Sequence, residues 1–345
     1  MRKLLYMASA VALVACGSSK ETANTDNDVT TDLAAKYAKT ITAKDLGKHL
    51  FIYASDEFEG RNTGEPGQKK AVKYLKDFYV SQGIASPLGG DDYFQEVPSE
   101  YLSNNRRGMT LKDSENVVAF IKGTEKPDEI VVISAHLDHE GVKNGEIYNG
   151  ADDDGSGTVA ILEIAEAFKQ AADAGKGPKR SILFLHVTGE EKGLLGSKYY
   201  TENPIFPLAN TVADLNIDMI GRVDDRHKGN PNYVYLIGSD KLSTELHDIS
   251  EAMNKKYTNI DLDYKYNDDN DPNRFYYRSD HYNFAKHNIP IIFYFNGTHA
   301  DYHRPTDTPD KINYEMLENR ARLVFHTAWE VANRENRVVV DKAAK

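Results

Sequence analysis

The chain has 345 residues, of which 40% are hydrophobic, a formal net charge of −11 and a single cysteine. A chain of this length buries one large core or two modest ones, and its composition is that of a soluble globular protein. The negative charge disfavours nucleic acid and anionic membrane surfaces as partners.

The first residues have the pattern of an export signal. Arg2 and Lys3 precede an apolar stretch, residues 4–14, that is too short to span a bilayer as a mature helix. The stretch ends in L-V-A-C-G (13–17), which resembles the lipobox of bacterial lipoproteins. In such proteins the cysteine becomes the lipidated first residue after cleavage. Cys16 is therefore the expected lipidation site.

This interpretation divides the chain into three parts. Residues 1–15 are expected to be a lipoprotein signal peptide, and the polar, unpatterned residues 16–31 predict a flexible tether. Residues 32–345 would form one domain, held by its lipid anchor at a membrane of the cell envelope of a bacterium. Because the mature chain has no other cysteine, it needs neither a disulfide bond nor a reducing compartment.

Hydrophobic periodicity predicts the elements of this domain. Residues 32–53 and 67–81 have apolar positions at helical spacing, with a turn at residues 60–64 between them. From Asn116 onward, short apolar runs alternate with helical segments. The expected strands are 117–121, 130–134, 182–187, 212–219, 233–237 and 291–295, and the expected helices are 158–172, 241–255 and 317–331. Only a short turn separates the first two strands, so we expect them to be neighbours.

Strand runs that are apolar throughout and separated by helices predict a mostly parallel, mixed sheet covered on both faces. The expected fold is α/β, a three-layer α/β/α sandwich. In such sheets, functional sites form beyond the carboxyl ends of the strands. His136, Glu190, Glu191 and Asp218 all close or follow predicted strands, so they are expected to lie at one edge of the sheet.

Five side chains that can bind metal recur in a fixed order along the second half of the chain. They are His136, Asp153, Glu191, Asp218 and His303, each at the end of an apolar run or in a glycine-rich turn. Two imidazoles and three carboxylates suit a pair of divalent cations, zinc above all. The ordered set predicts a two-metal hydrolase.

Two neighbouring carboxylates have expected roles of their own. Asp138 is two residues from His136, so on an extended segment both side chains face the same way. The Asp138 carboxylate can then hold the second imidazole nitrogen of His136. Glu190 and Glu191 are adjacent and diverge, which suits one side chain on a metal and the other on a water molecule.

Taken together, these motifs resemble the co-catalytic zinc aminopeptidases, family twenty-eight of the metallopeptidases. The motifs are H-L-D-H (136–139), G-A-D-D-D-G-S-G (150–157), T-G-E-E (188–191), N-I-D-M-I-G (216–221) and D-Y-H-R-P-T-D-T (301–308). The resemblance begins near Leu46 and includes E-G-R-N-T-G (59–64) and Y-F-Q-E-V (93–97). It implies a single zinc exopeptidase domain over residues 32–345. About twenty residues separate Gln95 from Asn116, so the protease-associated insert of many members is not expected.

The resemblance implies a ligand set for two zinc ions, with cobalt as a possible substitute. His136 and Asp218 would be terminal ligands of one ion, and Glu191 and His303 of the other. Asp153 would bridge the two ions, and the peptide bond that follows it would be cis.

The resemblance also implies the catalytic groups. Glu190 would take a proton from the attacking water and return it to the departing amine. Tyr302 would stabilise the oxyanion, and Asp138 would support the histidine ligand.

The family that these motifs resemble contains several functional classes, and the sequence favours one of them. An exopeptidase acting on peptides is favoured, and an aminopeptidase over a glutamate carboxypeptidase, because no arginine cluster is clearly placed for a substrate carboxylate. Glutaminyl cyclases share the ligands but depart from the G-S-G at 155–157. A non-catalytic binding lipoprotein, like the transferrin receptor ectodomain, should have lost ligands, and none is lost here.

Two further features of the sequence contain residue types found in active sites but are expected to have structural roles. His186 lies within a predicted strand and is expected to be a packed core histidine. Ser279-Asp280-His281 contains the residue types of a serine hydrolase, but contiguous residues rarely form a triad, so this segment is expected to be structural or to line a pocket.

Overall fold

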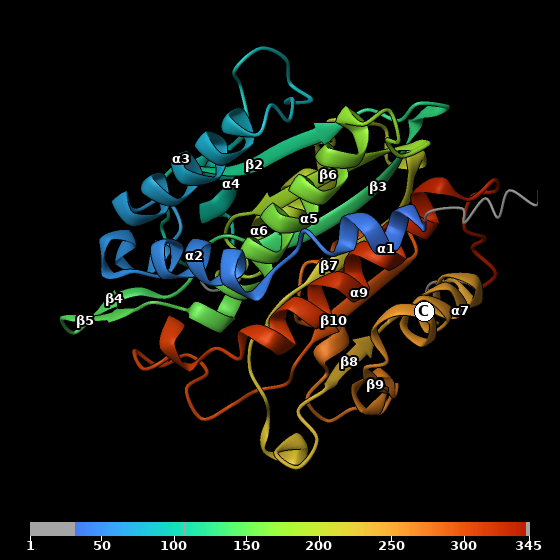
Figure 1. Ribbon diagram of the computed structural model, residues 1–345. Coiled ribbons are helices and arrows are strands. Elements are labelled where there is room, and N and C mark those ends of the chain that lie inside the picture. The colour runs from blue at the N-terminus through green and yellow to red at the C-terminus, as the bar shows by residue number, and fades with distance from the viewer. Residues whose placement is uncertain (1–31, 106–107, 343–345) are drawn as a thin grey trace, which may run out of the picture. The chain divides into compact units, whose positions relative to one another are not determined.

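An eight-stranded sheet forms the centre of the part of the chain that the computed structural model describes, residues 32–105 and 108–342 (Figure 1). In chain order its strands are β1 (Phe94–Val97), β2 (Ser114–Ile121), β3 (Lys126–His136), β6 (Arg180–Val187), β7 (Thr211–Ile217), β8 (Tyr233–Ile237), β9 (Asp261–Asp263) and β10 (Ile291–Phe295). A separate hairpin pairs β4 (Gly141–Lys143) with β5 (Glu146–Tyr148). The expected signal peptide, Cys16 and the tether lie outside the described residues.

The sheet is mixed, with parallel strands at its centre. The spatial order is β1-β2-β6-β3-β7-β10-β8-β9. Neighbouring strands from β6 through β3 and β7 to β10 run parallel, whereas β1, β2 and β8 each pair with an antiparallel neighbour. The expectation of a mostly parallel, mixed sheet is confirmed.

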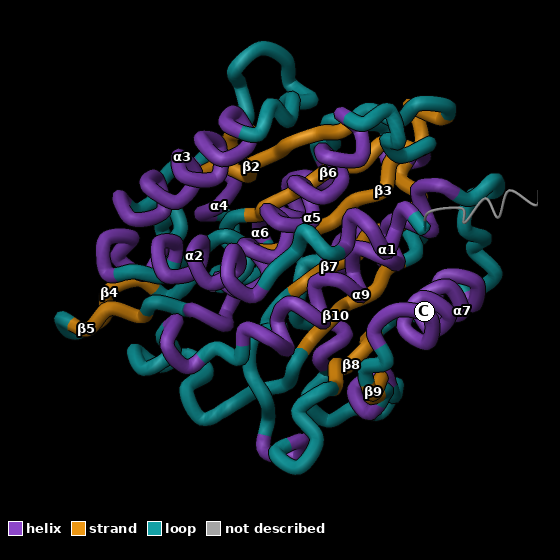
Figure 2. The backbone as a smooth tube through the Cα atoms, in the orientation of Figure 1, coloured by secondary structure: helices purple, strands orange, loops and turns teal. Residues whose placement is uncertain are grey.

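Helices cover both faces of the sheet. They are α1 (Leu33–Ala38), α2 (Ala43–Tyr53), α3 (Pro66–Ser81), α4 (Ser99–Ser103), α5 (Gly157–Asp173), α6 (Leu195–Glu202), α7 (Thr244–Met253), α8 (His281–Ala285) and α9 (Tyr314–Asn333). The larger core cluster joins one face of the sheet to α1, α2, α3, α5, α7 and α9, and a second cluster joins the opposite face to α6 and α8. Figure 2 shows the strands with these helices around them. The three-layer α/β/α prediction is confirmed.

Residues 130–133 of β3 illustrate why the central strands carry apolar side chains on both faces. Successive side chains of a strand point to opposite faces. Val131 and Ile133 pack into the larger core cluster, whereas Ile130 and Val132 pack into the second, and all four are fully buried. Because helices cover both faces of the sheet, the side chains on both faces of this segment are hydrophobic. The segment therefore lacks the alternation of polar and apolar residues that marks a half-exposed strand.

The expectation that β2 and β3 are neighbours is wrong, because β6 lies between them. Strand β6 pairs antiparallel with β2 and parallel with β3. The short connection between β2 and β3 crosses the start of β6. Its backbone N–H groups donate there: Thr124 N to the carbonyl of Pro178 at 3.0 Å, and Lys126 N to that of Lys179 at 2.8 Å. Sequence distance alone therefore indicated a pairing that a later strand prevents.

The predicted helix over residues 32–53 is two helices, α1 and α2. The Thr42 side chain accepts a hydrogen bond from Asp45 N and so starts α2. A threonine in this position satisfies one of the N–H groups that have no partner within the helix. The prediction was wrong at residues 39–42 because the apolar periodicity continues across a break that the cap creates.

A buried arginine in the turn after α2 connects the loops that follow β3 and β5. Arg61 is fully buried, and its guanidinium donates to four backbone carbonyls. Nε donates to Leu137 at 3.1 Å, Nη1 to Tyr53 at 3.1 Å and to Asn149 at 2.7 Å, and Nη2 to Gly150 at 2.9 Å. The planar guanidinium reaches all of these acceptors at once, which a single ammonium cannot do.

Arg61→Lys is therefore expected to lower the free energy of unfolding by on the order of 3 kcal/mol, because buried carbonyls lose their donors. Urea denaturation followed by circular dichroism measures this change. Arg226→Lys is the control, because Arg226 is exposed and pairs only at the surface with Asp263. Equal denaturation midpoints for the two variants would contradict the role given to Arg61.

Candidate metal centre

The carboxyl ends of the four central parallel strands bring the predicted site residues together. His136 is the last residue of β3, and Asp218 follows β7 directly. Glu190 and Glu191 lie in the turn after β6, and His303 lies in the loop after β10. Residues up to 167 positions apart in the sequence thus converge on one edge of the sheet, as expected for an open α/β sheet.

Asp154 ties two of these strand ends together. Its carboxylate accepts three backbone N–H groups: His136 at 3.2 Å, Gly157 at 2.9 Å and Met219 at 3.0 Å. The first of these residues ends β3, the second begins α5, and the third follows Asp218. Asp154 is fully buried, so these bonds are made out of contact with water and define the relative positions of three segments.

Asp152 makes a second set of connections on the other side of Asp153. Its Oδ1 accepts from Gly221 N at 2.7 Å, and its Oδ2 lies 3.1 Å from Nε2 of His299. The carboxylate of Asp307 accepts the N–H groups of Asp152 at 3.0 Å and of Asp153 at 3.3 Å. The Asp153–Asp154 peptide bond is cis, as the resemblance implied. With its neighbours held in this way, Asp153 faces the strand ends.

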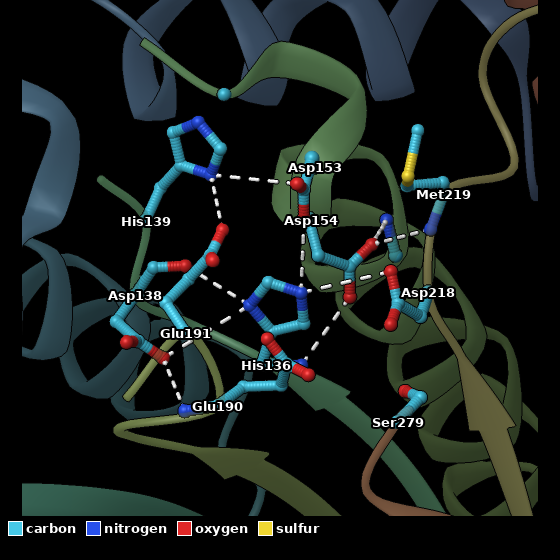
Figure 3. Close-up of polar contacts among 12 residues, drawn as sticks. His136, Asp138, His139, Asp153, Asp154, Glu190, Glu191, Asp218, Met219 and Ser279 are labelled. Carbon is cyan, nitrogen blue, oxygen red and sulfur yellow. Dashed lines mark hydrogen bonds and ion pairs between the residues drawn. The ribbon is translucent and has the colours of Figure 1, made fainter. Parts of the chain in front are cut away.

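The two carboxylate oxygens of Asp153 face two different groups of side chains (Figure 3). Oδ1 lies 3.1 Å from Nε2 of His136, and that nitrogen lies 3.6 Å from Oδ1 of Asp218. Oδ2 lies 2.9 Å from Nε2 of His303, and that nitrogen lies 3.2 Å from Oε1 of Glu191. One carboxylate is therefore shared between two clusters of potential ligands.

The spacing and chemistry of these atoms fit divalent metal ions. Ligand atoms about 2.0–2.1 Å from a tetrahedral zinc ion lie about 3.3–3.4 Å from one another, close to the spacings within both clusters. The Nδ1–H of His136 donates to the backbone carbonyl of Asp138 at 3.0 Å, which leaves a lone pair on Nε2. That nitrogen is buried and makes no hydrogen bond with any described residue. A cation would satisfy it.

The expected contact between the Asp138 carboxylate and His136 is wrong in its acceptor atom. The backbone oxygen of Asp138 accepts the imidazole N–H, whereas the nearest carboxylate oxygen lies 3.9 Å away. The carboxylate is turned toward two other donors, Thr63 Oγ1 at 2.7 Å and Glu190 N at 3.1 Å. Asp138 therefore orients His136 through its main chain and Glu190 through its side chain.

Glu190 lines a pocket together with both metal-binding clusters. The pocket contains Asp153, Asp218 and His303, so its floor is formed by potential metal ligands. Burial raises the pKa of the Glu190 carboxyl well above its usual range, with His136 opposing and Glu191 adding to the effect. A carboxyl group with a raised pKa can accept a proton and hold it at neutral pH.

Apolar side chains and one arginine form the rest of the pocket. The apolar wall consists of Met219, Phe275, Phe293 and Phe295. Tyr302 stacks on His303 with 4.0 Å between ring centroids, and its hydroxyl accepts from Nη2 of Arg278 at 3.4 Å. Burial raises the pKa of Tyr302, so the phenol stays protonated and can donate its hydrogen into the pocket.

The residues assigned structural roles have hydrogen-bond partners outside the two clusters of potential ligands. His186 is buried in β6, and its Nε2 lies 2.6 Å from the Tyr79 hydroxyl, as expected for a packed histidine. Ser279, Asp280 and His281 bind three different partners instead of one another. These partners are the side chain of Asn216, the side chain of Ser197 and the carbonyl of Tyr276, respectively.

Sequence reasoning missed several residues of this region. His139 is buried beside Glu191, and the signal for it was its place as the second histidine of H-L-D-H. Arg278 lines the pocket and directly precedes the segment Ser279-Asp280-His281. Thr63 and Arg61 fall in a segment that the sequence marked only as a turn and as part of the resemblance, with no indication of what they bind.

The fold and the shared carboxylate define an α/β domain whose strand ends carry candidate metal ligands. Comparison with known proteins shows which family has this arrangement. The model of Peptidase family M28 matches residues 116–328. The chain belongs to this family, so the resemblance read from its motifs is confirmed.

Individual relatives agree with this assignment. The chain is 28% identical over 303 residues to leupeptin-inactivating enzyme 1 of Streptomyces exfoliatus, which covers 81% of this chain and 59% of that enzyme. It thus spans little more than half the length of the curated relatives it matches. The structure of LapA aminopeptidase from Legionella pneumophila matches with a TM-score of 0.66 at 22% identity, covering 88% of this chain and 75% of LapA.

A glutaminyl cyclase also shares the fold. The structure of the enzyme from Bacteroides thetaiotaomicron, bound to N-acetylhistamine, matches with a TM-score of 0.62 at 17% identity. The match covers 84% of this chain and 98% of that one. At such low identity, both structural matches show the shared fold alone.

Removal of divalent cations is expected to lower the melting temperature, because ions that bind only the folded protein stabilise it. Added zinc should raise the melting temperature, because a thousandfold excess over Kd adds roughly 4 kcal/mol to the free energy of unfolding. Magnesium should be less effective, because it prefers oxygen ligands and the clusters contain imidazoles. Differential scanning calorimetry checks this. Identical melting curves for metal-free and zinc-saturated protein would contradict the metal centre.

Proposed function

We propose that the protein is a two-zinc exopeptidase that removes residues from the N-termini of peptides. The observation that carries this proposal is the Asp153 carboxylate, whose two oxygens face two separate ligand clusters beside the Glu190 carboxyl. Membership of Peptidase family M28 supports the same reaction class.

The residues divide into two sets of ligands. Asp153, His136 and Asp218 would hold one zinc ion, and Asp153, Glu191 and His303 the other, with cobalt as a substitute. Two such ions acidify a water molecule and polarise the scissile carbonyl. The three ligand carboxylates would offset three of the four positive charges of two dications.

Glu190 is the proposed general base and acid. Its carboxylate takes the proton of the attacking water and returns it to the departing amine. The hydrogen bond from Glu190 N to the Asp138 carboxylate holds the base in position. Tyr302 donates its phenolic hydrogen to the oxyanion of the tetrahedral intermediate, a contribution that grows as negative charge develops.

The pocket also suggests the substrate. The wall of Met219, Phe275, Phe293 and Phe295 favours an apolar side chain on the residue that is released. Glu190, a carboxylate outside both ligand sets, can also attract the ammonium group of a peptide N-terminus. Arg278 favours a second candidate, a carboxypeptidase resembling the glutamate carboxypeptidases, because it places a cation in the pocket where a substrate carboxylate could bind.

A panel of substrates tests these alternatives. We expect the zinc-loaded protein to hydrolyse aminoacyl-anilides, with leucyl and phenylalanyl substrates far ahead of aspartyl ones. A peptide ending in glutamate tests the carboxypeptidase candidate, and a peptide beginning with glutamine tests a glutaminyl cyclase. Turnover of only one of the last two peptides would replace the aminopeptidase proposal, and no turnover of any substrate would contradict the enzymatic function.

Replacing the adjacent glutamates should separate proton transfer from metal binding. Glu190→Gln keeps the shape of the side chain but cannot accept a proton, so kcat should fall by roughly 10²–10⁴ while the metal content stays unchanged. Glu191→Gln should instead weaken metal binding at one site, and excess zinc should partly restore its activity. Metal analysis and kcat are measured on both variants. The opposite pattern of metal loss would mean that the two roles are exchanged.

We also propose that the protein is a lipoprotein anchored through Cys16 to a membrane of a bacterial cell envelope. The proposal rests on the basic residues, apolar stretch and lipobox-like sequence that precede and include Cys16. Within the described residues, none of the helices combines the length and hydrophobicity that crossing a bilayer requires.

Cys16→Ser removes the thiol that would carry the lipid, so the variant should accumulate as an unprocessed precursor or leave the membrane fraction. Fractionation and mass spectrometry of the N-terminus check this outcome. Ser19→Ala, in the expected tether, is the matched control and should fractionate as the wild type does. If Cys16→Ser has the same mass increment and partitioning as its control, the protein is not a lipoprotein.

A further inference from the structure

A second histidine of the β3 loop is buried beside the candidate metal centre. His139 directly follows Asp138, and its side chain is completely shielded from solvent. Its N–H donates to the carbonyl of Arg61 at 3.3 Å, which holds the loop against the segment that also binds Asp138. This hydrogen bond contributes to holding His139 beside the candidate metal centre.

Gly150 makes the space that the His139 ring occupies. It has a φ of +54°, and a Cβ built on it would lie 2.4 Å from Cγ and 2.5 Å from Cδ2 of His139. Any larger residue at position 150 would displace the ring. The positive φ of Gly150 also favours glycine over residues with a side chain. The glycine that opens the acidic motif thus allows an imidazole to lie directly against the backbone near Asp153.

The ring nitrogens of His139 are buried, and no hydrogen bond of regular geometry with a described residue reaches either of them. Nδ1 nevertheless lies 3.0 Å from Oε1 of Glu191 and 3.7 Å from Oδ2 of Asp153, and Figure 3 shows the ring turned toward both. A buried nitrogen that lies this close to two carboxylate oxygens indicates a cation bound between the three atoms.

The same two oxygen atoms also face His303. Its Nε2 lies 2.9 Å from Oδ2 of Asp153 and 3.2 Å from Oε1 of Glu191. Four contacts among the four ligand atoms therefore measure 2.9, 3.0, 3.2 and 3.7 Å. Their mean is close to the separation of about 3.3 Å between ligands of a tetrahedral zinc ion. The His139 and His303 rings meet at an interplanar angle of 74°, so they approach the oxygens from different directions.

We propose that Nδ1 of His139 is a fourth protein ligand of the zinc ion held by Asp153, Glu191 and His303. This inference rests on the proposed two-zinc function and adds a ligand to it. The two ions then differ: the one at His136 has three protein ligands and an open position, whereas the other has the four protein ligands typical of a structural zinc. The second ion is consequently the one that is lost last.

Replacing His139 tests whether it binds the ion or only orients Glu191. His139→Asn places an amide N–H where Nδ1 lies, so it can still donate a hydrogen bond to Glu191 but cannot replace the imidazole. His139→Ala removes both possibilities. Loss of a supporting hydrogen bond costs 10–100-fold in metal affinity. We therefore expect both variants to bind the zinc ion of Asp153, Glu191 and His303 more than about 100-fold more weakly than the wild type does.

Zinc affinities are measured by competition with a chromophoric chelator, with total zinc determined on the same samples. His326→Asn is the matched control, because His326 is also buried but stacks on Tyr257 away from the centre. It should bind zinc as the wild type does. Wild-type affinity in His139→Asn, with weakened binding in His139→Ala, would mean that His139 only orients Glu191 and would overturn the proposal.

A crystal structure of the zinc-loaded wild type provides a test that does not depend on how the variants fold. The expected distance from Nδ1 of His139 to the nearer zinc ion is about 2.1 Å. Two zinc ions in their places with His139 Nδ1 beyond 3 Å from both would overturn this inference while leaving the proposed function intact. Absence of zinc binding by the wild type would overturn both.

Discussion

Three consecutive aspartates connect the ends of β3 and β7 at the candidate metal centre. Asp154 binds the backbone at the ends of β3 and β7, and Asp152 binds the backbone two residues beyond Met219. These bonds are buried, so each would be costly to leave unmade. The neighbouring aspartates make these backbone bonds, and the carboxylate of the middle residue, Asp153, faces the histidines with both of its oxygens.

The parallel centre of the sheet explains why this arrangement is available. Parallel strands end at the same edge, so β3, β6, β7 and β10 deliver their following residues to one place. The layers of helices on both faces bury the strands and keep the register from slipping. Two residues of the segment before the sheet bind the loop after β3. Arg61 donates to the backbone carbonyl of Leu137, and Thr63 donates to the carboxylate of Asp138.

Much of this could be predicted from the sequence, for identifiable reasons. The long, apolar strands and the amphipathic helices α5 and α9 have strong patterns, and β8 and β10 begin and end where the pattern predicted. The five candidate ligands were found because each stands at a strand end or in a glycine-rich turn. The short elements β1, β4, β5, β9, α4, α6 and α8 were missed, because so few residues show no period.

The missed features of the site share a different cause. The position of β6 between β2 and β3 depends on pairing between distant segments, which local patterns do not contain. The acceptor for His136 depends on residues distant in the sequence. Thr63 and Glu190 donate to the Asp138 carboxylate, so the imidazole donates to the backbone carbonyl of Asp138 instead. His139 looked ordinary beside His136 because only the folded loop shows where its ring points.

The central claim is that one carboxylate is shared by two cations. The most direct test is the zinc content of Asp153→Asn after dialysis against zinc at a concentration that saturates the wild type, measured by native mass spectrometry. The proposed arrangement predicts two zinc ions per wild-type chain and weakened binding of both in the variant, because each ion loses a charged ligand. A variant that keeps one ion at wild-type affinity would show that Asp153 serves a single metal and would contradict the account.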